Sequence, residues 1–278
     1  MKEYTDSGYK IQEFDSFSEV ADYLEKVPDL YDYTMTKKDE LRKSFHGVSS
    51  FDGIFDRLRY GDKVQTENFI NELKDLDTFD ELDVGIFRDV EGFAYDMGSV
   101  VNGEPECCLN FGSPEPKRSM NIYIDLGYTG WTDAETINNR GYALVKLINT
   151  LISKGYILNV YMVRYATLWG DGKYAQLVRV PTEFLTMSVV AYSCTCDFYR
   201  VVTWLLTAIH ANDKGYTGQS SAQASDEIIE SIRQRGDMYI GGGFTDYRFG
   251  HCSKEEAEEI VMEYYNDFLE SKGGVKCQ

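Results

Sequence analysis

The sequence contains no apolar run that approaches the length of a membrane-spanning helix. Such a helix needs about 20 consecutive apolar residues. The polar, acidic start Met1-Lys-Glu-Tyr-Thr-Asp also lacks the apolar stretch of a secretion signal. We therefore expect a protein that makes no membrane contact and stays in a cytoplasm.

Basic residues are scarce relative to acidic ones. The 278 residues include 28 Lys and Arg against 46 Asp and Glu, a net charge of −18. A protein that binds the phosphate backbone of a nucleic acid needs a basic surface, so direct nucleic-acid binding is not expected. Acidic residues concentrate in residues 62–96, with 11 acidic against 3 basic, and in residues 253–270, with 7 against 1.

The six cysteines match neither a disulfide framework nor a zinc site. The pair Cys107–Cys108 is adjacent, and Cys194–Cys196 is one residue apart, which is a poor framework for disulfides in a chain of this length. Zinc sites usually show ligand pairs two to four residues apart on both sides, and Cys194–Cys196 with His251–Cys252 falls short of that pattern. We expect reduced, buried thiols.

Recognisable catalytic and nucleotide-binding motifs are also absent. The sequence has no Gly-x-Gly-x-x-Gly and no Walker pattern, and it contains only three histidines. No catalytic triad is recognisable, and no histidine lies near Cys107–Cys108 in the sequence. The sequence therefore favours a non-enzymatic protein with no resident cofactor.

The clearest structural signal is the stretch from Met120 to Arg164. The apolar run Ile122–Asp125 predicts a strand buried on both faces, which is typical of a parallel sheet. A helix is predicted over 133–153 because its apolar residues recur at helical spacing, and a second strand over 156–164. A strand–helix–strand unit of this length is normally a right-handed parallel crossover.

Capping patterns predict where two helices begin. Thr132 with Glu135, and Ser253 with Glu256, match the capping box of a helix N-terminus. Gly155 suits the left-handed position just after the central helix.

We predict an α/β fold. Its core domain, residues 118–278, contains a mostly parallel, Rossmann-like sheet with helices on both faces. Residues 1–117 are expected to form a mixed, helix-rich N-terminal region packed on that core, with residues 1–45 helical and polar.

Two loops at the predicted carboxyl ends of the central strands carry the candidate ligand-binding residues. Ligands of open α/β sheets bind beyond that edge. The first loop supplies Gly127, Gly130 and Trp131, and the second supplies Trp169 and Asp171. The glycines permit a close approach of the backbone to a ligand.

The first loop also suggests a magnesium ion as a cofactor. Asp125, Thr129 and Asp133 present two carboxylates and a hydroxyl, the oxygen ligands that Mg²⁺ prefers. Metal-assisted phosphoryl hydrolysis would be the chemistry. The structural alternative is that Asp125 caps a turn and Asp133 complements the positive end of the helix.

A run of three glycines, Gly241–Gly243, follows the predicted strand Met238–Ile240. It lets the backbone approach a partner or a ligand closely. The alternative is a simple exit from the strand into a loop.

Several short motifs resemble a family of uncharacterised bacteriophage proteins. They are Phe45-x-Gly47, Tyr60-Gly61, Gly103-Glu-Pro-Glu-Cys107, and Arg140-Gly-x-Ala143 followed by Gly155-Tyr156. The resemblance covers about residues 14–270 and implies a phage origin, but this family has no assigned activity.

The central unit also resembles, more loosely, the first half of a von Willebrand A-type domain. Such domains hold a metal with an Asp-x-Ser-x-Ser loop. The loop here is Asp125-x-Gly127-x-Thr129, so one of the metal-binding hydroxyls is missing. A likeness of fold carries no function by itself.

Three functional hypotheses remain. We favour a phage-encoded, non-enzymatic interaction protein that binds a host or virion protein, in the host cytoplasm or in the virion, with the 21 tyrosines as a source of recognition surface. The first alternative is a Mg²⁺-dependent phosphohydrolase or nuclease centred on Asp125. The second is an acidic nucleic-acid mimic that inhibits a basic host protein through residues 62–96 and 253–270.

Overall fold

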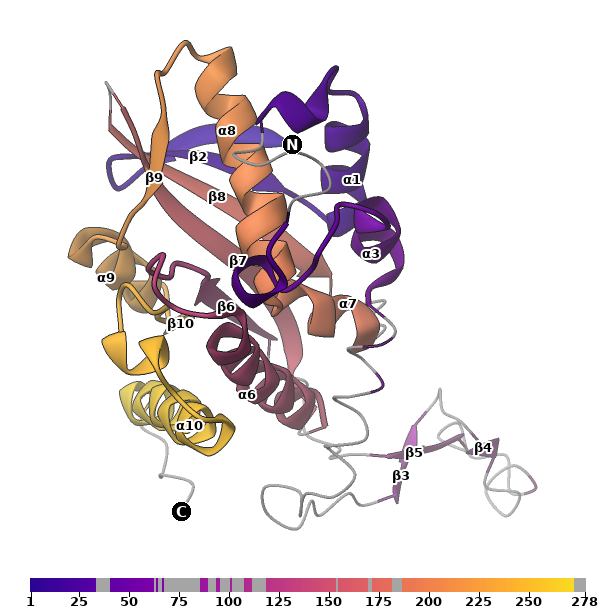
Figure 1. Ribbon diagram of the computed structural model, residues 1–278. Coiled ribbons are helices and arrows are strands. Elements are labelled where there is room, and N and C mark those ends of the chain that lie inside the picture. Colours follow the sequence, from indigo (N-terminus) through magenta and orange to yellow (C-terminus); the bar gives the residue numbers. More distant parts are fainter. Residues whose placement is uncertain are drawn as a thin grey trace.

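The chain folds around one mixed sheet, drawn in Figure 1. The computed structural model describes residues 1–33, 41–62, 64, 67, 86–89, 94–95, 101, 108–111, 119–153, 155–169, 172–181 and 187–272. The strands of the main sheet are β1 (Lys2–Asp6), β2 (Tyr9–Phe14), β6 (Ser119–Asp125), β7 (Ile157–Leu168), β8 (Gly172–Pro181), β9 (Gln219–Ser221) and β10 (Met238–Ile240). A second, small antiparallel sheet consists of β3 (Ile86–Asp89), β4 (Ala94–Tyr95) and β5 (Cys108–Phe111).

The helices vary from one turn to five. They are α1 (Phe17–Glu25), α2 (Lys43–His46), α3 (Ile54–Tyr60), α6 (Ala134–Ser153), α7 (Met187–Ser193), a π-helical segment (Phe198–Thr203), α8 (Trp204–Asp213), α9 (Asp226–Gln234) and α10 (Lys254–Ser271), with 3₁₀ turns at Leu30–Tyr33 and Tyr247–Gly250. No described helix is both long enough and apolar enough to cross a membrane.

The predicted central unit is confirmed. β6 pairs in parallel with β7, with Ile122 opposite Val160 and Asp125 opposite Val163, and α6 connects the two strands. α6 ends at Ser153, and Gly155, two residues further on, has the left-handed φ of 81° expected just after the helix. Two further pairs are parallel, β10 with β6 and β2 with β8.

The prediction of a mostly parallel sheet is wrong. The strand order is β1-β2-β8-β7-β6-β10, and β8 runs antiparallel to β7, as β1 does to β2. The reason is the short connection from Leu168 at the end of β7 to Gly172 at the start of β8. A connection of this length can join two antiparallel strands in a hairpin, whereas two parallel strands need a connection of a dozen or more residues. The fold is a mixed α/β fold, and the Rossmann-like and von Willebrand A-like comparisons remain predictions.

Residues 1–14 form two strands rather than the expected helix. The hairpin turns at Ser7 and Gly8, which have φ values of 48° and 77°. β2 then extends the same sheet to which the strands after residue 118 belong. Helical structure begins with α1, where the Ser16 side chain accepts a hydrogen bond from the amide of Glu19.

The two faces of the sheet are covered unequally. On one face, Ile122, Val160 and Met162 join the main core with side chains of α1, α3, α6, α7, α8 and α10. Figure 1 shows α6, α7 and α8 in front of the sheet. On the other face, Val163 and Tyr165 pack in a smaller cluster with α9.

Candidate functional site

A cavity of about 390 Å³ lies at the carboxyl end of β6. β6 accompanies β7 as far as Val163, and β9 takes its place beside β7 from Ala166 onward. The loop after β6 leaves the sheet between these two strands, and its residues Tyr128, Thr129 and Gly130 line the cavity. The cavity therefore lies at the end of the sheet from which the first candidate loop emerges.

One lining residue is an arginine at a core-facing strand position. Side chains alternate between the faces of a strand, and Leu158, Val160 and Met162 of β7 all belong to the main core. Arg164 is the next residue in that series and is 1% exposed. Burial lowers the pKa of its guanidinium, but an arginine stays protonated in proteins, so a full positive charge is enclosed here.

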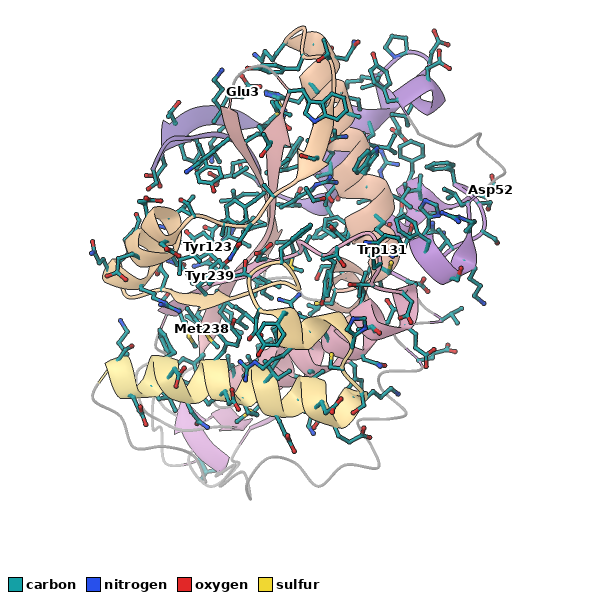
Figure 2. All side chains as sticks on the ribbon, turned by 60° about the vertical axis from the view of Figure 1, so that its left-hand side comes forward. Glu3, Asp52, Tyr123, Trp131, Met238 and Tyr239 are labelled. Carbon is teal, nitrogen blue, oxygen red and sulfur yellow. The ribbon has the colours of Figure 1, made fainter. Side chains whose placement is uncertain are left out.

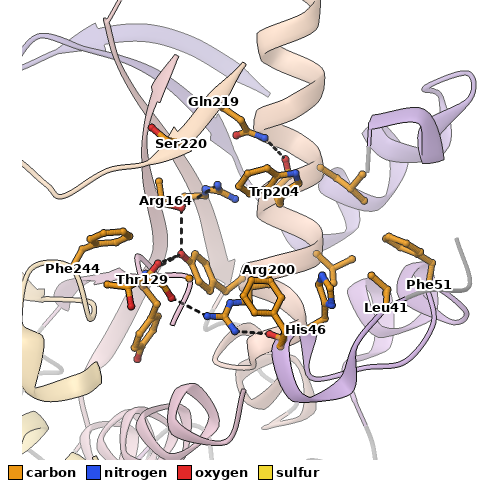
Figure 3. A pocket seen from close by; sticks show the side chains of 17 residues that line it. Leu41, His46, Phe51, Thr129, Arg164, Arg200, Trp204, Gln219, Ser220 and Phe244 are labelled. Atoms are coloured by element: carbon orange, nitrogen blue, oxygen red, sulfur yellow. Dashed lines mark hydrogen bonds between the residues drawn. The ribbon is translucent and has the colours of Figure 1, made fainter. Parts of the chain in front are cut away.

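Arg164 has only weak hydrogen bonds. Its Nη1 donates to Thr203 Oγ1 and its Nη2 to Ser221 Oγ, each over 3.3 Å, which is long for such a bond. Among the described residues, its Nε has no partner and no carboxylate acts on its charge. Its Cζ lies 5.8 Å from the ring centroid of Tyr199 and 5.0 Å from that of Trp204 (Figure 3).

A π-helical segment, Phe198–Thr203, forms the facing wall. π-helical turns are rare and occur frequently at functional sites. The hydroxyl of Tyr199 accepts the N–H of Tyr128 at 2.8 Å and donates to the Tyr128 carbonyl at 2.9 Å. These two bonds fasten the loop after β6 to the π-helical segment.

The next residue of that segment, Arg200, joins three parts of the chain. Its Nη1 donates to the carbonyl of Phe45 at 2.6 Å, and its Nη2 donates to the carbonyls of Thr129 and Thr132 at 3.0 and 2.6 Å. Its Cζ lies 3.8 Å from the centroid of the Phe45 ring. Both terminal nitrogens are thus occupied by the backbone, so Arg200 shapes the wall and adds a second positive charge.

The lining as a whole is aromatic and cationic. Its aromatic side chains, apart from His46, are Phe45, Phe51, Tyr128, Tyr199, Trp204 and Phe244. Among the described residues that line it, none is Asp, Glu or Cys. The described part of the chain therefore presents neither a carboxylate pair for acid–base catalysis nor a thiol nucleophile to the cavity.

Asp125 is completely buried and accepts three hydrogen bonds. Its Oδ1 accepts the N–H of Gly127 at 2.8 Å, and its Oδ2 accepts from the hydroxyls of Tyr239 at 3.1 Å and Thr245 at 2.8 Å. Burial raises the pKa of this carboxyl group. Asp125 thereby connects the end of β6 to β10 and to the loop that follows β10.

The other two candidate metal ligands also form hydrogen bonds within the chain. The hydroxyls of Thr129 and Thr132 lie 3.1 Å apart. Asp133 accepts the amide of Thr136 at 2.7 Å, and this bond lowers the pKa of its carboxyl. Asp133 is therefore the N-cap of α6, and the prediction of Thr132 as the cap is wrong. The described chain has no group of three His, Cys, Asp or Glu side chains suited to a metal; magnesium binding stays a prediction.

The candidate residues of the first loop have different surroundings. Gly130 lines the cavity. Gly127 lies against Asp125, because a Cβ on this glycine would be 3.1 Å from the Asp125 carboxylate. Trp131, the neighbour of Gly130, is 93% exposed (Figure 2).

The second candidate loop proves to be the tip of the β7–β8 hairpin. Trp169 follows β7, and a Cβ on Gly218 would lie 2.6 Å from its ring. β6 ends opposite Val163, and β7 continues for five more residues to Leu168. The second candidate loop therefore begins roughly 16 Å further along β7 than the point where the first loop leaves β6. Asp171 lies outside the described residues.

The three glycines after β10 allow two loops to touch. A Cβ on Gly242 would lie 2.6 Å from the carbonyl oxygen of Gly127, and one on Gly243 would lie 2.5 Å from the ring of Tyr128. The close approach expected from these glycines is thus made to the chain's own backbone. It places Phe244, whose N–H donates to the Gly127 carbonyl at 3.1 Å, in the cavity wall.

Arg164 and Arg200 were not among the candidate site residues predicted from the sequence. A signal for Arg164 was present, because this residue continues the series of inward-facing residues in the predicted strand 156–164. Arg200 likewise interrupts the apolar run Phe198–Val202. No local pattern indicated the contact of Arg200 with Phe45, since the two residues are 155 positions apart.

These features define a mixed α/β protein with a cationic, aromatic cavity at the carboxyl end of the inner strand β6. Residues 5–269 match the family described as a domain of unknown function, DUF7192, and the chain belongs to this family. No curated protein and no solved structure matches the chain significantly. An uncharacterised family was the expectation, and the phage origin remains a prediction.

Proposed function

We propose that the protein is a non-enzymatic binding protein whose recognition site is the cavity at the carboxyl end of β6. The observation that carries this proposal is the lining itself, which is aromatic, cationic and, among the described residues, without carboxylates or thiols. A volume of about 390 Å³ lies within the range of about 300–1,000 Å³ for small-molecule sites.

Segments distant in sequence meet around the cavity. Its walls come from residues 41–51, the loop 128–130, Arg164 of β7, the segment 199–205, β9 and Phe244. A ligand that contacts all of them is bound by the folded protein and not by the unfolded chain. Such binding raises the stability of the protein with ligand concentration.

A neutral aromatic fluorophore, phenylnaphthylamine, tests the binding function. We expect saturable binding of one probe per chain with enhanced emission. Ser220→Trp, a change in the exposed part of the lining, should remove the binding, whereas Gln234→Trp on the exposed side of α9 should leave it unchanged. Binding that does not saturate, or that Ser220→Trp leaves intact, would show that the cavity is not the site.

A protein partner is a second element of the proposal, and Trp131 supports it. This side chain is almost fully exposed beside the cavity lining, and tryptophan is typical of the energetically dominant residues of interfaces. We infer a host or virion protein as the partner, in the host cytoplasm or virion, as the phage resemblance implies. Trp131→Ala should abolish retention of this partner from infected-host lysate and leave phenylnaphthylamine binding intact. If the wild-type protein and Trp131→Ala retain the same partner equally, Trp131 does not contribute to a protein interface.

A further inference from the structure

The arginines that are buried or partly buried differ in how their charge is neutralised. Arg57, which is partly buried, pairs with Asp197 at 2.9 Å. Arg140 donates to the carbonyl of Gly241 at 2.7 Å, and the charge of Asp125 acts on it. Arg164 has neither kind of partner among the described residues.

A buried charge without a partner is unfavourable for folding. Transfer of a guanidinium from water to an interior is compensated only by an opposite charge and a full set of hydrogen bonds. At Arg164 the protein supplies two long bonds to hydroxyl groups and the faces of two aromatic rings. An anion within reach of the guanidinium would compensate this charge.

The surroundings of Arg164 suit an anion with an apolar part. Ser221 lines the cavity next to the guanidinium, and its hydroxyl, which accepts from Arg164 Nη2 at 3.3 Å, can donate to a ligand. Trp204 lies against the guanidinium, and Phe244 closes the opposite side of the cavity (Figure 3). A flat ring that enters between these side chains would bring an attached oxyanion to Arg164.

We propose that the cavity binds a compact ligand that has an oxyanion, a carboxylate or a phosphate, on a flat apolar body, and that Arg164 holds the oxyanion. The planar guanidinium matches the paired oxygens of such a group. This inference names the ligand class of the binding function proposed above and rests on it.

Two fluorophores that share one ring system separate the inference from that function. Anilinonaphthalene sulfonate carries an oxyanion, and phenylnaphthylamine does not. We expect the wild-type protein to bind the sulfonate about tenfold or more tightly than the neutral probe, since hydrogen bonds to ionised groups are the stronger ones. Arg164→Met should remove this preference and keep the binding of the neutral probe. Arg233→Met, at an exposed position of α9, should change neither.

The melting temperature without ligand gives a readout that a purely structural arginine would not produce. Because Arg164→Met removes an unpaired buried charge and keeps an unbranched, apolar side chain along the stem of the arginine, it should raise the midpoint by about 2–4 °C. A structural role predicts a lower midpoint instead. Arg164→Lys retains the charge without the planar fork, so it should fold and bind the sulfonate more weakly than wild type.

Each result has one meaning. Equal affinity for the two probes, with no effect of Arg164→Met or Arg164→Lys on the sulfonate, would overturn the inference and leave the binding function standing. Failure of both probes to bind would overturn the function itself. Where the sulfonate binds through Arg164, displacement by indole acetate and by phenyl phosphate decides whether the oxyanion of the natural ligand is a carboxylate or a phosphate.

Discussion

Asp125 shows, at the scale of single residues, how this protein holds a buried charge with hydrogen bonds. One amide and two hydroxyls donate to its carboxylate, and no lysine or arginine donates to it among the described residues. Loss of the carboxylate would leave three buried donors without an acceptor. Each unsatisfied donor then costs its full desolvation free energy, which is larger than the net gain from an ordinary hydrogen bond. Asp125 therefore has a structural role that does not depend on bound metal.

Truncation of Asp125 should be strongly destabilising. Asp125→Ala removes all three acceptor contacts, and we expect the free energy of unfolding to fall by about 2–4 kcal/mol. Asp125→Asn keeps an oxygen for the amide of Gly127 and should cost less. Urea denaturation of both variants measures the difference, and equal losses would contradict the role assigned to the hydrogen bonds.

The pH dependence of stability should also report on Asp125. Burial raises its pKa in the folded protein above that in the unfolded chain, so the folded state binds this proton more tightly. This contribution to stability is complete below the unfolded pKa, near 3.9, and is lost as the pH rises through the folded value. As the pH rises, the wild-type protein should therefore lose stability relative to Asp125→Asn, which has no carboxyl group to titrate at this position. A constant difference would show that the carboxyl titrates normally.

Two buried thiols should be unreactive in the native protein. Burial raises the pKa of Cys194 to about 11 and that of Cys196 to about 12, and the thiolate is the reactive form. Peptide mapping after treatment with N-ethylmaleimide at mildly alkaline pH should find both unmodified, and both modified after unfolding in urea. Rapid native labelling of either would contradict their burial.

At the scale of secondary-structure elements, close backbone approaches fix the positions of the helices and loops around the sheet. A Cβ on Gly141 of α6 would lie 2.3 Å from the carbonyl oxygen of Cys194. Backbone atoms cannot move aside as a flexible side chain does. Gly141 therefore sets the distance between α6 and the chain that leads into the π-helical segment, and with it the cavity wall.

Gly141→Ala should consequently destabilise the protein although alanine favours helices. The clash with the Cys194 carbonyl should lower the unfolding free energy by about 1–3 kcal/mol. Gly250→Ala is the matched control, because a Cβ there meets no atom within 4 Å, and its effect should be small. If both substitutions leave the urea midpoint unchanged, the two segments do not approach each other as described.

The sequence predicted elements best where one local pattern decided the outcome. The unit 120–164, the capping box at Ser253 and the left-handed Gly155 all follow from periodicity or capping alone. The antiparallel pairing of β7 with β8 was missed because Trp169 and Asp171 were assigned to a ligand loop, although so short a connection requires an antiparallel return. The role of Arg164 depends on its tertiary neighbours in the segment 199–205 and in β9, which no local pattern contains.

At the scale of the whole molecule, the cationic cavity contrasts with a net charge of −18. The acidic segment 253–270 forms α10, whereas most of residues 62–96 lies outside the described residues, so the acidic-mimic hypothesis stays a prediction. An acidic exterior repels anions at long range, but salt screens such exposed charges beyond about 8–10 Å. We therefore expect enclosed groups of the cavity, and not the overall electrostatic field, to recognise the proposed ligand.

The magnesium hypothesis has a whole-molecule test. A metal bound only by the folded state raises the melting temperature. On the present account Mg²⁺ and Mn²⁺ at millimolar concentration should leave the midpoint of the wild-type protein unchanged, because the candidate ligand Asp125 is occupied by donors of the chain. A rise that Asp125→Asn abolishes would instead establish the metal site.

Fluorine NMR of the protein labelled with fluorotryptophan shows directly whether the oxyanion ligand binds in the cavity. The chain has three tryptophans, and only Trp204 lines the cavity, so each resonance, assigned by a Trp→Phe variant, reports on a different place. Addition of anilinonaphthalene sulfonate should shift the Trp204 resonance and leave that of Trp169 in place. A shift at Trp169 or Trp131 with Trp204 unchanged would contradict the account.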